Sequence, residues 1–268
     1  MSVKKALTIA GSDSSGGAGL QADIKTFQEL GVYGMSAVTS IVAMDQKDWS
    51  HKVFPIDVNT VEAQLDTILS TGIDAMKTGM LGTVDIIELA ARKIKEYGLD
   101  KVVIDPVMVC KGTDEVLMPE NTVAMRELLL PLATVVTPNL FEAWQLSGLG
   151  PITTIDEMKE AAKIIHDQGA KYVLIKGGTK LEGQDKAIDL IYDGKEFTIL
   201  ESEKFATTYT HGAGCTTAAA ITAELAKGKT VEEALATAKE FISAAIEHGW
   251  KLNEFVGPVL HGAYRTYK

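Results

Sequence analysis

The residues whose types and spacing are best suited to catalysis lie between His211 and Thr217, in the sequence His-Gly-Ala-Gly-Cys-Thr-Thr. Two glycines and an alanine lead directly into a run of small residues, Thr216 to Lys227, that is typical of a helix. A turn without bulky side chains at a helix N-terminus exposes several backbone N–H groups beside the positive end of the helix dipole. Such a turn binds anions, and enzymes use it to stabilise a phosphoryl group in transfer or an oxyanion.

Cys215 lies at the same point of the chain. A thiol at a helix N-terminus loses its proton more readily than a free thiol, so this position predicts an acidified Cys215 that can act as a base. The alternative is a glycine-rich loop with a packing cysteine, because short glycine motifs often arise by chance. His211 is interpreted as a helix-entry residue without chemistry, and Asp13 as a residue that caps a turn.

Composition and charge exclude several other classes of protein. The chain has 268 residues and a net charge of −10, which argues against a protein that tracks nucleic-acid phosphates. No apolar run approaches the length of a membrane span. The two cysteines, Cys110 and Cys215, indicate neither a disulfide framework nor a zinc site. We therefore expect a cytoplasmic protein with free thiols and with no nucleic-acid or membrane partner.

The segments that must position these residues alternate between strand-like and helix-like patterns. Strands are expected at 6–10, 36–43, 74–77, 101–105, 134–137, 172–176, 188–192 and 196–200, and helices at 18–30, 59–68, 86–97, 154–168, 213–226 and 231–247. This alternation predicts a single α/β domain, residues 1–268, with a central mainly parallel sheet and helices on both faces. Ligands bind at the carboxyl ends of the strands in such sheets, so the polar and glycine-rich strand ends predict one site built from several loops.

The sequence lacks the common nucleotide-binding fingerprints. Residues 11–19 are glycine-rich but do not have the G-x-G-x-x-G spacing, and no P-loop motif occurs. A kinase of another class needs donors for the transferred group, a cation that bridges the phosphates and a group that activates the acceptor hydroxyl. The 212–215 loop supplies donors, and Lys176 can neutralise phosphate charge. Asp105 and Glu142 are carboxylates suited to Mg²⁺, and the thiol described above is the candidate base.

Six stretches, in this order, resemble the hydroxymethylpyrimidine kinase and pyridoxal kinase branch of the ribokinase superfamily. They are residues 6–27, 77–82, 104–108, 137–142, 175–178 and 210–216. The resemblance spans essentially the whole chain. It implies a ribokinase-like α/β fold, a homodimer and an ATP:alcohol phosphotransferase that uses ATP and Mg²⁺. Most of the wider superfamily has an aspartate where Cys215 stands, whereas this branch has cysteine.

The resemblance also implies roles for individual residues. The family's anion hole corresponds to Gly212, Ala213, Gly214 and Cys215. Positions near the nucleotide phosphates and the metal correspond to Asn139, Lys176 and Glu142, and Asp105 is the second expected metal carboxylate. The positions around the acceptor ring are Asp23, Met80 and Val107, to which Met44 and His51 are added. Each role has an alternative without function. Asp23 would be solvated, His51 would be hydrogen-bonded at the surface or in the core, and Glu142 would only favour the start of a helix. Met44, Met80 and Val107 would pack in the core.

One departure from the pyrimidine kinases bears on the substrate. Those kinases carry a glutamine where this chain has Met44, and an amide can hydrogen-bond an aminopyrimidine edge whereas a thioether cannot. The chain is more similar to the dual-cysteine pyridoxal kinases, in which a second cysteine lies on a mobile lid. Cys110 follows a predicted strand end, where a lid near residues 107–117 would begin. Lys111 beside it favours the thiolate, although a packing role is the alternative for this cysteine.

The resulting hypothesis is an ATP-dependent kinase that phosphorylates the 5′-hydroxymethyl group of pyridoxal, pyridoxine or pyridoxamine. Cys110 would capture the aldehyde of pyridoxal as a hemithioacetal, and Cys215 would assist deprotonation of the hydroxyl. The alternatives are a hydroxymethylpyrimidine (phosphate) kinase of thiamine biosynthesis and a non-catalytic protein that binds a vitamer or nucleotide. The sequence leaves the vitamer preference and the adenine pocket open.

Overall fold

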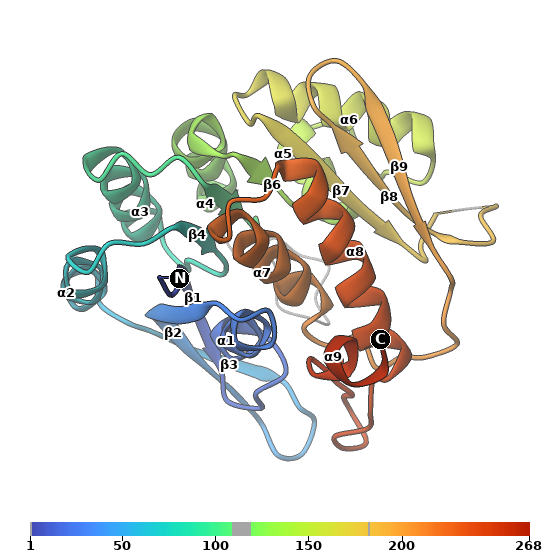
Figure 1. The fold of residues 1–268 in the computed structure, drawn as a ribbon, viewed down its shortest axis with the longest axis horizontal. Helices are drawn as coiled ribbons and strands as arrows, with labels where there is room; N and C mark the ends of the chain where they lie inside the picture. The colour runs from blue at the N-terminus through green and yellow to red at the C-terminus, as the bar shows by residue number, and fades with distance from the viewer. Residues whose placement is uncertain (1, 109–118, 182) are drawn as a thin grey trace.

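The computed structural model describes residues 2–108, 119–181 and 183–268 (Figure 1). Within these ranges, nine strands form one sheet in the order β3-β2-β1-β4-β5-β6-β7-β8-β9. The strands β1, β2 and β4 to β7 run parallel, and β3, β8 and β9 are antiparallel to their neighbours. Their bounds are β1 Lys5–Asp13, β2 Tyr33–Met44, β3 His51–Pro55, β4 Ala75–Thr78, β5 Val102–Ile104, β6 Val135–Val136, β7 Tyr172–Gly178, β8 Ala187–Tyr192 and β9 Phe197–Ser202.

Helices cover both faces of this sheet (Figure 1). Their bounds are α1 Gly19–Glu29, α2 Val58–Leu69, α3 Val84–Glu96, α4 Pro119–Ala124, α5 Leu140–Ser147, α6 Ile155–Asp167, α7 Ala213–Ala226, α8 Val231–Glu247 and α9 Ala263–Tyr267. A π-helical turn η1 (Met125–Leu129) and a 3₁₀ turn η2 (Leu130–Leu132) follow α4.

Alternate side chains of each central strand enter two different cores, as the two-residue period of a strand requires. In β5, Val102 and Ile104 pack with the apolar faces of α2, α3 and α6, whereas Val103 packs with α1, α7 and α8. Because both faces are covered, the central strands are mostly apolar rather than alternating in polarity. The predicted mainly parallel sheet with helices on both faces is confirmed.

Local sequence signals place most helix ends correctly. The spacing of Thr154 with Glu157 and of Thr230 with Glu233 predicts capping boxes, and both form at the starts of α6 and α8. The spacing of Asn59 with Glu62 predicts a third, which is wrong, because the side chain of Asp57 accepts the N–H of Thr60 and α2 begins after Asp57. No helix in the described ranges is both long and apolar enough to cross a membrane.

The parallel strands all end at one edge of the sheet, and the expected site loops gather there. Val107 and Met108 follow β5 at this edge. The rest of the expected lid, including Cys110 and Lys111, falls at 109–118, outside the described residues.

Candidate active site

A cavity of about 650 Å³ opens where the parallel strands end. It is lined by almost every described residue that the sequence singles out, from β1 to α7. These are Met44, His51, Met80, Asp105, Val107, Asn139, Glu142, Lys176, Gly212, Ala213, Gly214 and Cys215. Asp23 does not line it, and Cys110 lies outside the described residues.

The N-terminus of α7 forms one wall of the cavity. Gly212 is the N-cap residue and has a φ of 82°, a left-handed conformation that glycine adopts without strain. The N–H of Ala213 donates a hydrogen bond to the carbonyl of Thr210 at 3.1 Å. In the described part of the chain, the N–H groups of Gly214 and Cys215 have no backbone carbonyl as partner. The open donors of the expected anion hole are therefore these two amides.

The Cys215 thiol is not acidified in this structure, so the prediction from the helix dipole is wrong. Burial raises the pKa of Cys215 to about 12, and the negative charge of Asp23 adds to this shift. Lys77 and a hydrogen bond from the Gly19 N–H act in the opposite direction but do not compensate. Loss of water around a thiolate outweighs the attraction of a helix N-terminus here. Cys215 therefore holds its proton at neutral pH.

A partly buried cation faces the two open amides. A Cβ placed on Gly214 would lie 3.3 Å from Lys176 Nζ, so this ammonium rests against the start of α7. Lys176 also forms an ion pair with Asp105 Oδ1 at 3.1 Å. Burial lowers the pKa of Lys176, but the charges of Asp105 and Glu142 outweigh it and raise the pKa, so the lysine is positively charged. Two amides and an ammonium around one point make a site for a phosphoryl group.

Asn139 and Glu142 begin α5 and bond each other in a capping box. Glu142 Oε2 accepts the N–H of Asn139 at 2.8 Å, and Asn139 Oδ1 accepts the N–H of Glu142 at 2.9 Å. Glu142 is buried, and this burial raises its pKa to about 7, although Lys176 acts in the opposite direction. The predicted helix-start role of Glu142 is thus confirmed, and its carboxylate still borders the cavity.

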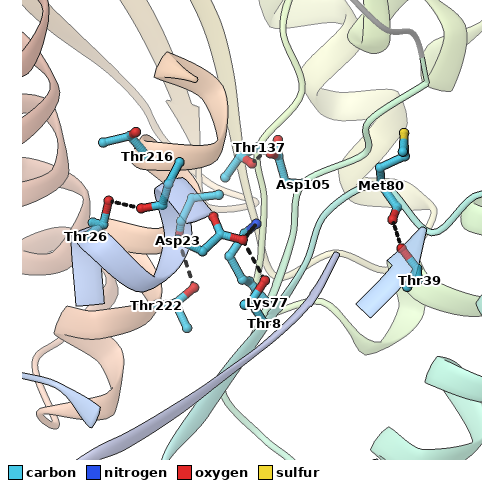
Figure 2. Close-up of polar contacts among 12 residues, drawn as sticks. Thr8, Asp23, Thr26, Thr39, Lys77, Met80, Asp105, Thr137, Thr216 and Thr222 are labelled. Atoms are coloured by element: carbon cyan, nitrogen blue, oxygen red, sulfur yellow. Dashed lines mark hydrogen bonds and ion pairs between the residues drawn. The ribbon is translucent and has the colours of Figure 1, made fainter. Parts of the chain in front are cut away.

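Asp105 and Glu142 together fit a divalent cation that is held mainly by a substrate. Asp105 Oδ1 accepts a hydrogen bond from Thr137 Oγ1 at 3.1 Å (Figure 2). The same oxygen accepts the bond from Lys176 Nζ. No group of three or more His, Cys, Asp or Glu side chains in the described ranges is arranged to hold a metal by itself. Mg²⁺ commonly uses only one or two protein carboxylates and takes its other ligands from substrate phosphates and water, so this donor set suits it.

A fully buried ion pair lies beneath the cavity. Lys77 Nζ donates to Asp23 Oδ2 at 2.9 Å, and Thr8 Oγ1 donates to the same oxygen at 2.6 Å (Figure 2). Neither Asp23 nor Lys77 is exposed, so the alternative of a solvated Asp23 is excluded. The expected place of Asp23 beside the acceptor ring is wrong as well, because its carboxylate is fully buried and does not line the cavity. Lys77 also borders the cavity, whereas Asp23 reaches it only through this lysine.

The importance of Lys77 is not evident from the local sequence pattern. The only signal is a lysine inside the short buried strand β4, where a charge requires a partner. A second buried pair was missed as well. His211 Nε2 lies 2.7 Å from Asp13 Oδ2, so the interpretation of His211 as a plain helix-entry residue is wrong.

Another part of the cavity wall is formed by residues expected around an acceptor ring. Met44 and His51 are directly opposite each other in the β2–β3 ladder. The backbone of Met80, just after β4, is held by Thr39 Oγ1, which donates to its carbonyl at 2.6 Å (Figure 2). Burial lowers the pKa of His51, so its ring is neutral at physiological pH. This part of the wall offers apolar side chains and one neutral imidazole.

Comparisons with known proteins agree on one family. The family model described as phosphomethylpyrimidine kinase matches residues 13–260. The pyridoxine kinase of Bacillus subtilis is 64% identical over 99% of this chain and 98% of its own length. The hydroxymethylpyrimidine/phosphomethylpyrimidine kinase of the same organism is 45% identical over 99% of this chain and 97% of its own. The structure of the pyridoxal kinase from Staphylococcus aureus in complex with AMP-PCP and pyridoxal has a TM-score of 0.95 and 56% identity, and it covers 100% of this chain and 97% of that one.

Proposed function

This chain belongs to the phosphomethylpyrimidine kinase family, and from that premise we propose that it is an ATP-dependent kinase of vitamin B6 vitamers. The acceptor would be the 5′-hydroxymethyl group of pyridoxal, pyridoxine or pyridoxamine. One observation carries the proposal: Lys176 lies against the start of α7, beside the open amides of Gly214 and Cys215, in the cavity that Met44 and His51 also line. Relatives named for pyridoxine and pyridoxal kinase activity support the choice of vitamer.

The nucleotide phosphates would lie between α5 and α7. Lys176 would offset the charge of the transferring group, and the amides of Gly214 and Cys215 would donate to its oxygens. Asp105 and Glu142 would hold Mg²⁺ together with the phosphates, and the ion would supply charge neutralisation when bound. Asn139 fixes Glu142 for this task through the capping box.

Cys215 would act as a hydrogen-bond partner that orients the acceptor hydroxyl. Its pKa of about 12 makes a thiolate rare at neutral pH. Phosphoryl transfer usually passes through a loose transition state in which the attacking oxygen needs little prior ionisation. The hydroxyl proton can then leave late, to an oxygen of the transferred phosphoryl group or to water, because a thiol that keeps its own proton cannot take up a second one. In this proposal the amides and Lys176, more than Cys215, supply most of the rate enhancement.

The aldehyde of pyridoxal is the proposed target of Cys110. The sulfur of Cys110 would bond the aldehyde carbon, and the thiol proton would move to the aldehyde oxygen, so that no further reactant is consumed. Pyridoxine has no aldehyde and would not use this step. The lid, the homodimer, the cytoplasmic location and the absence of nucleic-acid or membrane partners stay predictions of the sequence.

A second candidate function is phosphorylation of hydroxymethylpyrimidine, because a kinase with that activity in its name is 45% identical over nearly the whole chain. Met44 disfavours it, since a thioether cannot pair with an aminopyrimidine edge. The test is ADP release by the wild-type protein with pyridoxal, pyridoxine, pyridoxamine and hydroxymethylpyrimidine as separate acceptors. We expect the B6 vitamers to have the highest kcat/KM. A preference for the pyrimidine would overturn the proposal, and ATP binding without turnover of any acceptor would indicate a binding protein.

A further inference from the structure

The contact between Asp13 and His211 joins two loops that are distant in the sequence and that both line the cavity. Asp13 is the last residue of β1, and His211 is separated from α7 only by Gly212. Both side chains are buried. Neither is needed for the reaction steps proposed above, so a buried titratable pair at the edge of the site is left without a task.

The Asp13 carboxylate orders the loop between β1 and α1. It accepts the N–H groups of Ser15 and Ala18, each at 2.8 Å. Burial raises the pKa of Asp13, but the hydrogen bonds from His211 and Ser15 and the charge of His211 lower it to about 2. The carboxylate is therefore ionised at every pH at which the protein would be assayed.

The His211 residue ties the start of α7 to the C-terminal segment. Its N–H donates to the carbonyl of Gly257 at 3.1 Å, and its carbonyl accepts the N–H of Val259 at 3.2 Å. The imidazole thus stands where three segments meet. A neutral ring with its proton on Nε2 can donate to Asp13, so the bond does not require a charged histidine.

The packing of two glycines shows how closely this contact sets the distance between the loops. A Cβ on Gly17 would overlap the His211 ring, and a Cβ on Gly212 would overlap the carbonyl oxygen of Gly17. The same β1–α1 loop leads into Gly19, whose N–H is near enough to Cys215 to act on the pKa of its thiol. A shift of either loop would therefore move the open amides of Gly214 and Cys215.

We propose that Asp13 and His211 form a positioning pair, which holds the amides of Gly214 and Cys215 where they meet the transferring phosphoryl group. The inference rests on the proposed kinase function. Preorganised donors stabilise a transition state only if they are held in place before the reaction. The pair would therefore affect kcat more than the binding of either substrate.

A matched pair of variants tests this inference. The side-chain amide of His211→Gln can still donate to Asp13, whereas His211→Leu keeps similar bulk without a donor. We expect His211→Leu to lower kcat by about 10-fold or more and His211→Gln to recover most of the loss. The KM for ATP and for pyridoxine should change by less than about 3-fold in both variants. Equal kcat for His211→Leu and wild type would overturn the inference.

A binding measurement gives a readout that general loosening would not reproduce. ADP with aluminium fluoride and pyridoxine imitates the planar transferring group, whereas ADP alone does not. We expect His211→Leu to weaken the aluminium fluoride complex by about 10-fold or more and to leave the affinity for ADP nearly unchanged. A parallel loss for both ligands would indicate a structural role only and would overturn the inference.

A double-mutant cycle tests whether the two residues act as a unit. Asp13→Asn combined with His211→Leu should lose no more kcat than the more damaging single variant, whereas additive losses would count against the pair. The control is His261→Leu, since His261 is also buried and bonds Thr216 of α7 at 3.1 Å but does not line the cavity. We expect it to keep kcat within about 3-fold of wild type. A loss as large as that of His211→Leu would assign both effects to a loosened helix and would overturn the inference.

The wild-type protein separates the inference from the proposed function. If wild type phosphorylates none of the acceptors, the kinase proposal fails before the pair is tested. If wild type is active and both His211 variants match it, only the positioning role fails.

Discussion

Lys77 and Asp23 form an ion pair in which neither side chain has any exposed surface, with 2.9 Å between Lys77 Nζ and Asp23 Oδ2. The pair connects β4 to α1 beneath the floor of the cavity. Burial would lower the pKa of Lys77, but the carboxylates of Asp23 and Asp105 raise it, so the ammonium stays charged. A buried ammonium is stabilised only by its carboxylate partner, because no water can reach it to solvate the charge.

Removal of one partner should therefore cost much more than removal of both. We expect Lys77→Met to lower the free energy of unfolding by about 3–5 kcal/mol, since Asp23 is left buried without a counter-ion. The double variant Lys77→Met with Asp23→Asn should recover most of that loss. Urea unfolding followed by circular dichroism measures both values. A double variant as unstable as the single one would contradict the dependence on charge pairing.

Glu142→Gln should have opposite effects on stability and activity. The folded-state pKa of Glu142 is raised to about 7 from an ordinary value of 4.5 by burial. The folded protein therefore binds this proton more tightly than the unfolded chain, and stability falls as pH rises through the window between 4.5 and 7. We expect the glutamine variant to melt at a higher temperature than wild type at pH 8, with a smaller advantage at pH 5.

The same variant should need more Mg²⁺ for half-maximal rate, because it lacks one of the two expected carboxylates. For wild type, the Mg²⁺ requirement should fall as the pH rises through 7, as Glu142 ionises. The comparison of Mg²⁺ titrations at pH 6 and pH 8 checks this. A pH-independent requirement in wild type would argue against Glu142 as a ligand.

Reaction of Cys215 with iodoacetamide should be slow at neutral pH. Burial raises its pKa to about 12, so the reactive thiolate is scarce. We expect the rate to keep rising beyond pH 10 without a plateau, when labelling of the Cys215 peptide is followed by mass spectrometry in a Cys110→Ser background. A plateau near pH 7 would restore the acidified thiol that the helix dipole suggests.

Substitution of Gly212 should damage both the fold and the reaction. Gly212 has a φ of 82°, and a Cβ there would overlap the carbonyl oxygen of Gly17. Gly228 is a matched control, because its φ is 87° but a Cβ would have no heavy atom within 4 Å. We expect Gly228→Ala to cost about 1–2 kcal/mol of stability through backbone strain alone, and Gly212→Ala to cost more. Only Gly212→Ala should reduce kcat strongly, as measured by ADP release.

Cys110→Ala should distinguish the vitamers. If the thiol adds to the aldehyde, kcat/KM for pyridoxal should fall well below that of wild type, while the value for pyridoxine stays near wild type. Parallel rate assays with the two substrates are sufficient. Equal losses on both would remove the hemithioacetal from the reaction. Cys215→Ala serves as the contrasting variant, since it should reduce turnover of both vitamers alike.

The parts of the fold that depend on local chemistry could be predicted from the sequence. The capping boxes at Thr154 and Thr230 can be recognised because each involves residues three apart. The turn preference of Asp193–Gly194 likewise predicts the hairpin that joins β8 to β9. The start of α2 was misplaced because Asp57 offers a competing cap two residues earlier than Asn59.

Long-range contacts could not be predicted in the same way. Asp13 and His211 are 198 residues apart, and Asp23 and Lys77 are 54 apart, so no local pattern reports either pair. The Cys215 prediction failed for a related reason. The helix N-terminus is visible in the sequence, but the burial and the Asp23 charge that outweigh it depend on the assembled tertiary structure.

The interlocked glycines, Gly17 and Gly212, belong to opposite ends of the polypeptide. During synthesis, the loop that holds Gly17 leaves the ribosome long before the loop that holds Gly212 has been made. The incomplete chain therefore has only one of the two loops that position the phosphate-binding amides. Phosphotransfer can begin only after translation has passed α7 and the C-terminal segment at Gly257–Val259 that bonds His211. A product that ends ahead of α7 would contain the sequence of all nine described strands but lack the amides of Gly214 and Cys215, and we expect it to be inactive.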